Sequence, residues 1–162
     1  MQPNHQKFTP GFTLLEVLLS VAIMILIAGA AFPLYGNLQW TAQINDSTAR
    51  IVGDMRLARE LSAARLADSQ YGIFFEVNPL SGDRMVFFRG SSYATRTPAY
   101  DRITTFSDTL IMQTALGGGV SEIIFSKNSA RPSSVGTIML THSASGALRT
   151  ISINTYGMVD VQ

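Results

Sequence analysis

An apolar segment near the start of the chain restricts its possible folds more than any other feature. Residues 12–32 read FTLLEVLLSVAIMILIAGAAF and contain one charged side chain, that of Glu16. As an α-helix with a rise of 1.5 Å per residue, these 21 residues are about 31 Å long, which matches the hydrocarbon core of a bilayer. The sequence therefore predicts a long helix that can cross a membrane.

Three interpretations of this helix compete. A secretory signal peptide would use Lys7 as its positive region and Ala28-Gly29-Ala30 as its cleavage site. A plain membrane anchor is the second interpretation, and a helix in which Glu16 has a specific role is the third. A carboxylate inside an apolar membrane helix costs about 3 kcal/mol on insertion scales, and such residues are usually functional. Because neither a signal peptide nor a plain anchor needs a carboxylate, Glu16 favours the third interpretation.

The residues around Glu16 match a known processing motif. The sequence GFTLLEV occupies residues 11–17, directly after a short polar leader that ends in KFTP. This motif closely resembles the cleavage site of type IV prepilins and type II secretion pseudopilins. The resemblance implies that a membrane aspartic peptidase, the prepilin peptidase, cuts between Gly11 and Phe12 and then methylates the new N-terminus. Glu16 would become the fifth residue of the mature chain, where the family has its glutamate.

The residue types suit this chemistry. Gly11 has no Cβ, so a protease can approach its backbone closely. Cleavage creates a positive amine on Phe12, and the Glu16 carboxylate can pair with that amine on a neighbouring subunit. An unpaired charge is strongly penalised in a medium of low dielectric constant, so this pairing drives the subunits into register.

Pro33 is the second residue of this helix that the family pattern assigns to assembly. It would be the twenty-second residue of the mature chain, where the family often has a proline that loosens the helix. Proline removes one helical hydrogen bond, which is compatible both with a simple kink and with a stretch that melts when subunits pack in a filament. The sequence does not separate these two possibilities.

A second helical segment follows the apolar one. Residues 38–67 contain no proline and one glycine, and their apolar residues recur at roughly helical spacing. These residues are Ile44, Ile51, Met55, Ala58 and Leu61. The pattern predicts that the membrane helix continues into water and packs one stripe on a globular domain. The arginines on its other faces alternate with acidic residues, and Arg56 is placed to pair with Glu60. We therefore expect a solvated face here, not a DNA-binding stripe.

Short alternating or apolar runs replace the helical pattern from Ser69 onward, and turn-forming residues separate them. The polar stretch 91–107 is expected to be a long loop, or a loop with one weak edge strand. One long helix followed by many antiparallel strands indicates an α+β fold, in which the helix packs on an antiparallel sheet or sandwich. The predicted strands are Tyr71–Val77, Arg84–Arg89, Thr109–Thr114, Ser121–Ser126, Gly136–His142, Leu148–Asn154 and Met158–Val161.

The second half of the chain extends the family resemblance. The run RLARELSAAR at residues 56–65, followed by a strand, is similar to the helix end of the GspH/FimT group of minor pseudopilins and minor pilins. The runs IIF (123–125), GTIML (136–140), RTISI (149–153) and YGMV (156–159) resemble the C-terminal strands of that group. The chain has no cysteine, so it cannot close the disulfide loop common in major type IV pilins. The arginine-rich turn that follows the last glycine in DNA-binding members is also missing, because MVD follows Gly157.

The residues do not combine into a catalytic or metal site. His5 lies in the leader, and His142 stands alone near a strand end, where we expect it at the surface or half-buried. No G-x-S-x-G motif occurs, and the three glycines 117–119 are not followed by the Lys-Ser/Thr of a phosphate loop. The acidic residues lack the alternating spacing of a calcium loop. The sequence therefore predicts a protein that is not an enzyme and has no metal or cofactor.

These observations divide the chain into four parts. Residues 1–11 are a leader peptide, 12–34 a transmembrane and assembly helix, 35–68 the soluble continuation of that helix, and 69–162 a β-rich globular domain. The expected function is that of a minor pilin or pseudopilin, a structural subunit of a type IV pilus or a type II secretion pseudopilus. A single pass through the bacterial inner membrane, with the globular domain outside the cytoplasm, would precede entry into the filament. Lys7 in the leader is consistent with this orientation.

The resemblance also implies partners. They are other pilin or pseudopilin subunits, the prepilin peptidase, membrane lipid, and an inner-membrane assembly platform with its ATPase. Nucleic acid is not expected, because a formal net charge of +1 gives no long-range attraction for it.

Two alternatives stay open. A DNA-binding minor pilin of a competence pilus would bind phosphates in a salt-dependent manner. Its candidate residues are Arg84, Arg89, Arg96, Arg102 and Arg131. A secreted β-rich protein would instead be cleaved after Ala30 by ordinary signal peptidase.

Overall fold

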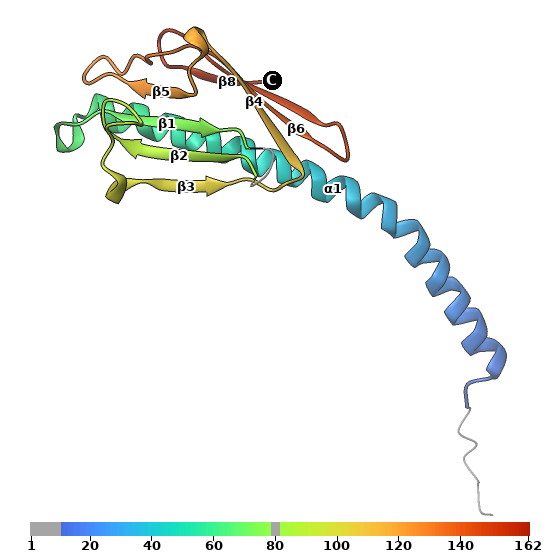
Figure 1. Ribbon diagram of the computed structural model, residues 1–162. Helices are drawn as coiled ribbons and strands as arrows, with labels where there is room; N and C mark the ends of the chain where they lie inside the picture. Colours follow the sequence, from blue (N-terminus) through green and yellow to red (C-terminus); the bar gives the residue numbers. More distant parts are fainter. Residues whose placement is uncertain (1–10, 79–81) are drawn as a thin grey trace, which may run out of the picture. The chain divides into compact units, whose positions relative to one another are not determined.

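The computed structural model describes residues 11–78 and 82–162. The chain forms two compact units, one up to Leu38 and one from Gln39 to Gln162, and their boundary falls within helix α1, Leu14–Ala63 (Figure 1). In the described part of the chain, no helix combines the length and the apolar character that crossing a bilayer requires. The transmembrane character predicted for residues 12–34 is therefore not supported there.

The part of α1 that belongs to the second unit presents one buried stripe. Ile44, Ile51, Met55 and Ala58 have no exposed surface, and Leu61 packs against them from a partly buried position. Spacings of three and four residues place these side chains on one face of the helix. The apolar stripe predicted from the sequence is thus confirmed.

The helix ends earlier than the sequence pattern predicts, at Ala63 instead of about Ala67. Arg65 adopts a left-handed conformation with φ of 53°, and a short 3-10 turn, η1 (Leu66–Asp68), follows it. The helix end is fixed by a contact with the first strand, because the Tyr71 backbone N–H donates to the buried Ser62 hydroxyl over 2.9 Å. The sequence has neither glycine nor proline near Ala63, so no local signal indicates that the helix ends there.

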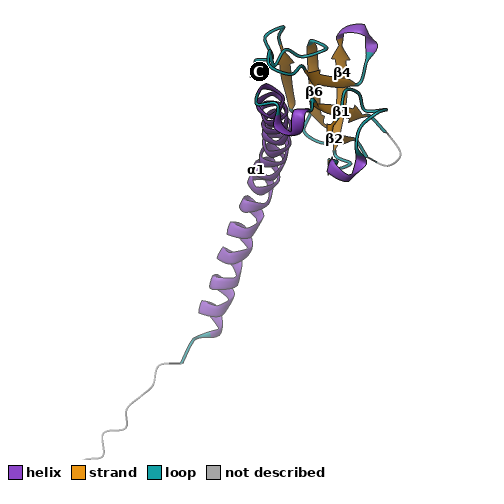
Figure 2. Ribbon diagram, turned by 90° about the vertical axis from the view of Figure 1, so that its left-hand side faces the viewer, coloured by secondary structure: helices purple, strands orange, loops and turns teal. Residues whose placement is uncertain are grey.

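Eight strands follow, and they form two antiparallel sheets of four strands each (Figures 1 and 2). The first sheet has the order β3-β2-β1-β5 and consists of β1 (Tyr71–Glu76), β2 (Arg84–Arg89), β3 (Arg102–Thr105) and β5 (Glu122–Phe125). The second has the order β4-β6-β7-β8 and consists of β4 (Leu110–Leu116), β6 (Gly136–His142), β7 (Leu148–Ile153) and β8 (Val159–Val161). The predicted α+β class with antiparallel strands is confirmed.

Strands β2 and β6 have the predicted bounds, and the other predicted strands differ by one or two residues at one end or at both ends. The stretch 91–107 contains the 3-10 turn η2 (Pro98–Tyr100) and the edge strand β3, as one of its two interpretations foresaw. This stretch is held to the first sheet by aromatic contacts. Tyr93 stacks on Phe74 with ring centroids 3.9 Å apart, and the Arg96 guanidinium lies 3.8 Å from the Tyr93 ring centroid.

A single cluster of buried side chains joins the helix to both sheets. Ile51 of α1, Ile73 and Phe75 of β1, and Leu140 and Ile151 of the second sheet belong to it, and each is at most 1% exposed. Burying a side chain of this size stabilises a fold by about 2 kcal/mol. The second unit therefore has a hydrophobic core of its own, to which α1 contributes one wall.

Candidate functional site

The residues that the sequence assigns to processing and assembly lie at the start of α1. Gly11 and Phe12 precede the helix without regular secondary structure. A Cβ added to Gly11 would meet no atom within 4 Å, and Phe12 is 83% exposed. Among the described residues, the Gly11–Phe12 peptide bond therefore lies in an exposed segment outside the helix, whereas the bond after Ala30 lies inside α1.

Thr13 caps the helix, and Glu16 occupies the third helical position. The Glu16 backbone N–H points at the Thr13 hydroxyl, with a nitrogen–oxygen distance of 3.3 Å. The order Thr-x-x-Glu at a helix start is that of a capping box. A carboxylate here also interacts favourably with the positive end of the helix dipole. The position of Glu16 in the first turn thus suits a carboxylate within the single subunit, a feature that the sequence pattern alone did not indicate.

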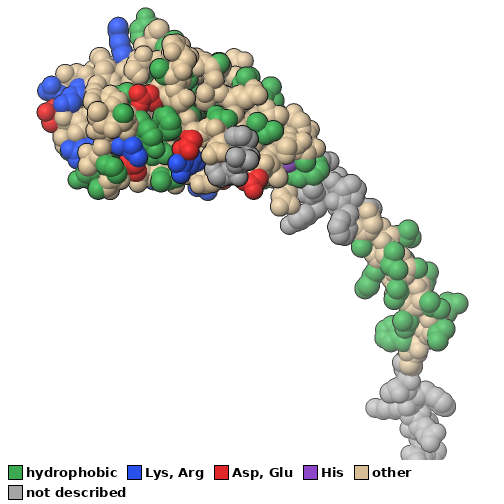
Figure 3. All heavy atoms as spheres, in the orientation of Figure 1, with side chains coloured by type: hydrophobic (Ala, Val, Ile, Leu, Met, Phe, Trp, Pro, Cys, Tyr) green, Lys and Arg blue, Asp and Glu red, His purple; other side chains and the backbone are tan. Residues whose placement is uncertain are grey.

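Beyond Glu16, the first part of α1 exposes apolar side chains along its length, on the face seen in Figure 3 among others. From Val17 to Ile27, the exposed fractions of the large apolar side chains lie between 74% for Leu26 and 47% for Ile23. An exposed apolar surface of this extent marks a region that contacts protein or lipid. Pro33, the other predicted assembly residue, lies within α1, and the helix continues through it.

Four of the five arginines proposed for DNA binding are engaged within the chain. Arg84 pairs with Glu76 and Arg96 with Asp101, each over 2.7 Å. These carboxylates raise the pKa of both guanidinium groups. Arg102 pairs with Asp54, and Arg89 donates to the Ser69 hydroxyl over 2.8 Å. Arg131 is the member of this set for which the described residues provide no acceptor. The arginines therefore act mainly as internal contacts of the fold.

The ion pair predicted between Arg56 and Glu60 does not form among the described residues. The pair with this spacing on α1 is instead Asp46 with Arg50, at 2.9 Å. Both of its side chains are more than half exposed, so it contributes little to stability.

The pair of Asp54 and Arg102 links α1 to the edge strand β3. The Asp54 side chain is 15% exposed and that of Arg102 is 53% exposed. Burial raises the pKa of Asp54 above its ordinary value, although the charge of Arg102 opposes the rise. Ionised Asp54 is therefore a net cost to the folded state that Arg102 offsets only in part.

Replacing Asp54 with asparagine is expected to flatten the pH dependence of stability. Because the pKa of Asp54 is raised on folding, the folded protein holds this proton more tightly than the unfolded chain. Its contribution makes the free energy of unfolding fall as the pH rises from about 4 through the raised pKa. Asparagine does not titrate, so in Asp54→Asn the free energy of unfolding should fall less steeply with pH over this range. Urea unfolding of both proteins between about pH 3 and pH 7 measures it; parallel curves would contradict the assignment.

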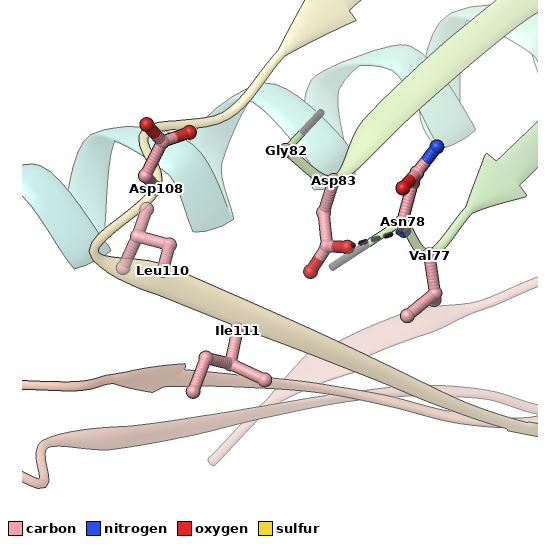
Figure 4. A pocket seen from close by; sticks show the side chains of 7 residues that line it. All are labelled: Val77, Asn78, Gly82, Asp83, Asp108, Leu110 and Ile111. Atoms are coloured by element: carbon pink, nitrogen blue, oxygen red, sulfur yellow. Dashed lines mark hydrogen bonds between the residues drawn. The ribbon is translucent and has the colours of Figure 1, made fainter. Parts of the chain in front are cut away.

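A hollow of about 460 Å³ lies where the turn between β1 and β2 approaches β4. Figure 4 shows the Asp83 carboxylate pointing into this region and accepting the Asn78 backbone N–H, over 2.9 Å. The other carboxylate oxygen accepts the Met112 backbone N–H over 2.6 Å. Asp83 therefore ties the first sheet to an edge of the second. In the sequence, Asp83 lies in the turn directly before β2, and no local pattern indicates its partner Met112, 29 residues away.

The described residues contain no group of three or more His, Cys, Asp or Glu that could hold a metal ion. The position expected for His142 was wrong, because it is 1% exposed. Its Nδ1 accepts the Ser145 backbone N–H over 3.2 Å, and its ring centroid lies 5.7 Å from that of Trp40. His142 is therefore buried at the end of β6, next to the Trp40 ring. The sequence pattern did not indicate that these two residues are neighbours.

A long N-terminal helix that packs its second part on antiparallel sheets, and begins with an apolar exposed part, is the architecture of pilin-like subunits. The fold of this chain is similar to a solved structure, that of the minor pseudopilin EpsH from the type 2 secretion system of Vibrio cholerae. The match has a TM-score of 0.54 at 11% sequence identity, and it covers 74% of this chain and 96% of that one. The chain therefore has a pseudopilin-like fold. No protein-family model and no curated protein matches its sequence.

Proposed function

We propose that this protein is a minor pilin or pseudopilin, a structural subunit that enters a type IV pilus or type II secretion pseudopilus through its N-terminal helix. The observation that carries the proposal is the start of α1. There, an exposed Gly11–Phe12 bond is followed by a capped helix with one carboxylate, Glu16, and a long exposed apolar surface. The pseudopilin-like fold of the chain supports it independently.

Processing would convert the start of α1 into an assembly site. Cleavage after Gly11 leaves a positive amine on Phe12, next to the positive end of the helix dipole, and this proximity is unfavourable. A carboxylate from a neighbouring subunit relieves the repulsion. Glu16 is the group that can supply it, because it is the only charged side chain of residues 12–34. The pair is strong because the apolar side chains around it exclude water.

The exposed apolar surface of α1 supports a place for this helix among lipids before assembly and among other helices afterwards. We place the subunit in the bacterial inner membrane before assembly, with the globular domain outside the cytoplasm, and in the filament afterwards. In the filament, the apolar part of α1 would pack against equivalent helices of other subunits. Prepilin peptidase, with methylation of Phe12, and an inner-membrane platform complete the pathway. Pro33 would allow α1 to bend or loosen as it packs.

Replacing the Glu16 carboxylate is expected to block assembly and leave processing intact. Both Glu16→Ala and Glu16→Gln should enter filaments at least about tenfold less than wild type, because losing one partner of a buried ion pair costs about 3 kcal/mol or more. Cells that express the cognate filament machinery would be sheared, and the protein quantified in the filament and cell fractions. Intact mass of the cell-associated protein should show a chain that starts at Phe12 with an added methyl group.

Thr13→Ala is the matched control, because it removes the helix cap and keeps the charge. If Glu16 contributed to assembly only by capping the helix, Thr13→Ala would fail to assemble. Glu16→Gln would then assemble, because glutamine also suits a capping box. Normal incorporation of Glu16→Gln would overturn the pairing mechanism. A mature chain that starts at Ala31 would overturn the proposed function as a whole.

A further inference from the structure

A small basic hollow lies within the second unit, between the last turns of α1 and the turn that leads into β8. Its volume is about 250 Å³, and it is lined by Arg56, Arg59 and Glu60 on one side and by Gly157, Met158 and Val159 on the other. It is separate from the start of α1, and none of the residues assigned to processing or assembly contributes to it.

Arg59 is placed in this hollow without an acceptor. Its Nε is buried and has no hydrogen-bond partner among the described residues. Gly157, with φ of 73°, covers it closely, since a Cβ on this glycine would lie 3.1 Å from Arg59 Nε and 2.9 Å from the Ala130 carbonyl oxygen. A buried donor without an acceptor costs about 1–3 kcal/mol. The Arg59 Nε–H is therefore an unpaired donor at the wall of the hollow.

Arg56 lies three residues earlier on the same helix, so the two guanidinium groups are neighbours on its surface. The described residues provide no acceptor for Arg56 either, although Glu60 lines the same hollow. Elsewhere in the described chain, four other arginines and Lys127 form ion pairs with carboxylates. Arg56 and Arg59, by contrast, have no carboxylate partner among the described residues and line the same hollow.

We propose that this hollow binds a carboxylate side chain of a partner protein. Two adjacent guanidinium groups suit a carboxylate, which can accept several of their hydrogen bonds at once. The rim favours a protein over a nucleic acid. Tyr156 and Met158 are 65% and 63% exposed beside it and offer apolar contact to a protein chain. Glu60 repels any anion, but a single carboxylate meets less repulsion than a nucleic acid, which carries one charge at every phosphate. The proposal does not depend on filament assembly.

The Nε–Hε signal of Arg59 in the ¹H–¹⁵N NMR spectrum tests the site directly. The full-length chain, in zwitterionic detergent, would be titrated at constant ionic strength with the blocked tripeptide Leu-Glu-Leu. Leu-Gln-Leu serves as the isosteric neutral control, and Arg59→Lys identifies the signal by its loss. We expect a saturable shift with the glutamate peptide and none with the glutamine peptide. Arg56→Gln should weaken the binding about tenfold, which corresponds to about 1.4 kcal/mol.

Arg131→Gln is the matched control, since Arg131 is also an arginine for which the described residues provide no acceptor, but it does not line the hollow. It should leave the affinity unchanged. If Arg131→Gln lost as much affinity for the glutamate peptide as Arg56→Gln, the peptide would be attracted by the overall positive charge, and the proposed site would be overturned. The absence of a shift, or equal shifts with both peptides, would overturn it too. A larger shift with a single-stranded oligonucleotide than with the peptide would replace the carboxylate ligand with a phosphate chain.

Discussion

Gly136→Ala is expected to lower the free energy of unfolding by more than about 3 kcal/mol, the range that marks a broken backbone arrangement. Gly136 begins β6 with φ of 152°, where it pairs with Leu116 of β4. A Cβ at this position would lie 2.1 Å from the Ala115 carbonyl oxygen and 2.9 Å from the Leu116 Cα. Both obstacles are backbone atoms of the neighbouring strand, so no side-chain rotation can relieve them. Urea unfolding followed by circular dichroism measures the loss.

Gly146→Ala is the control for the backbone strain alone. Gly146 also has a positive φ, 66°, but a Cβ there would meet no atom within 4 Å. Its replacement should cost only about 1 kcal/mol, the usual penalty for placing a non-glycine residue in the left-handed region. Equal losses in the two variants would show that the contact between β4 and β6 at Gly136 is not the cause.

Asp83→Ala is expected to cost about 3 kcal/mol, because it removes the charged acceptor of one buried N–H group, that of Met112, and of one part-buried N–H group, that of Asn78. Asp83 is 6% exposed and accepts the backbone N–H groups of Asn78 and Met112. The contact to Met112 holds β4 beside the hairpin of the first sheet, so its loss should also speed hydrogen exchange at the Met112 amide. Equilibrium unfolding and amide exchange of the same variant measure both effects.

Asp108→Ala is the matched control for Asp83, because Asp108 lines the same hollow but is exposed. Its replacement should change stability by no more than about 0.5 kcal/mol, as is usual at exposed positions. If both variants lost the same stability, the effect would come from the charge of the hollow and not from the hydrogen bonds of Asp83.

Local patterns in the sequence predicted the elements well. The spacing of Ile44, Ile51 and Met55 predicted the buried stripe of α1, and alternating runs predicted β2 and β6 with their observed bounds. These signals depend on one helix turn or one strand, so nearby residues suffice to reveal them. The family motif around Gly11, Phe12 and Glu16 is equally local, and with Pro33 it remains a prediction that the described structure leaves for experiment.

Contacts across the chain decided the rest. The end of α1 depends on the contact between Ser62 and Tyr71, and the burial of His142 depends on Trp40. The arginines pair with carboxylates that can be distant in the sequence, as for Arg102 and Asp54, which are 48 residues apart. Arg56 illustrates the limit, since helical spacing predicted a pair with Glu60 that does not form. The apolar helix, the strand pattern and the processing motif were thus determined by sequence alone. The pairing of charges and the hollow at Arg59 were decided by tertiary structure, because they depend on which distant backbone segments the core brings together.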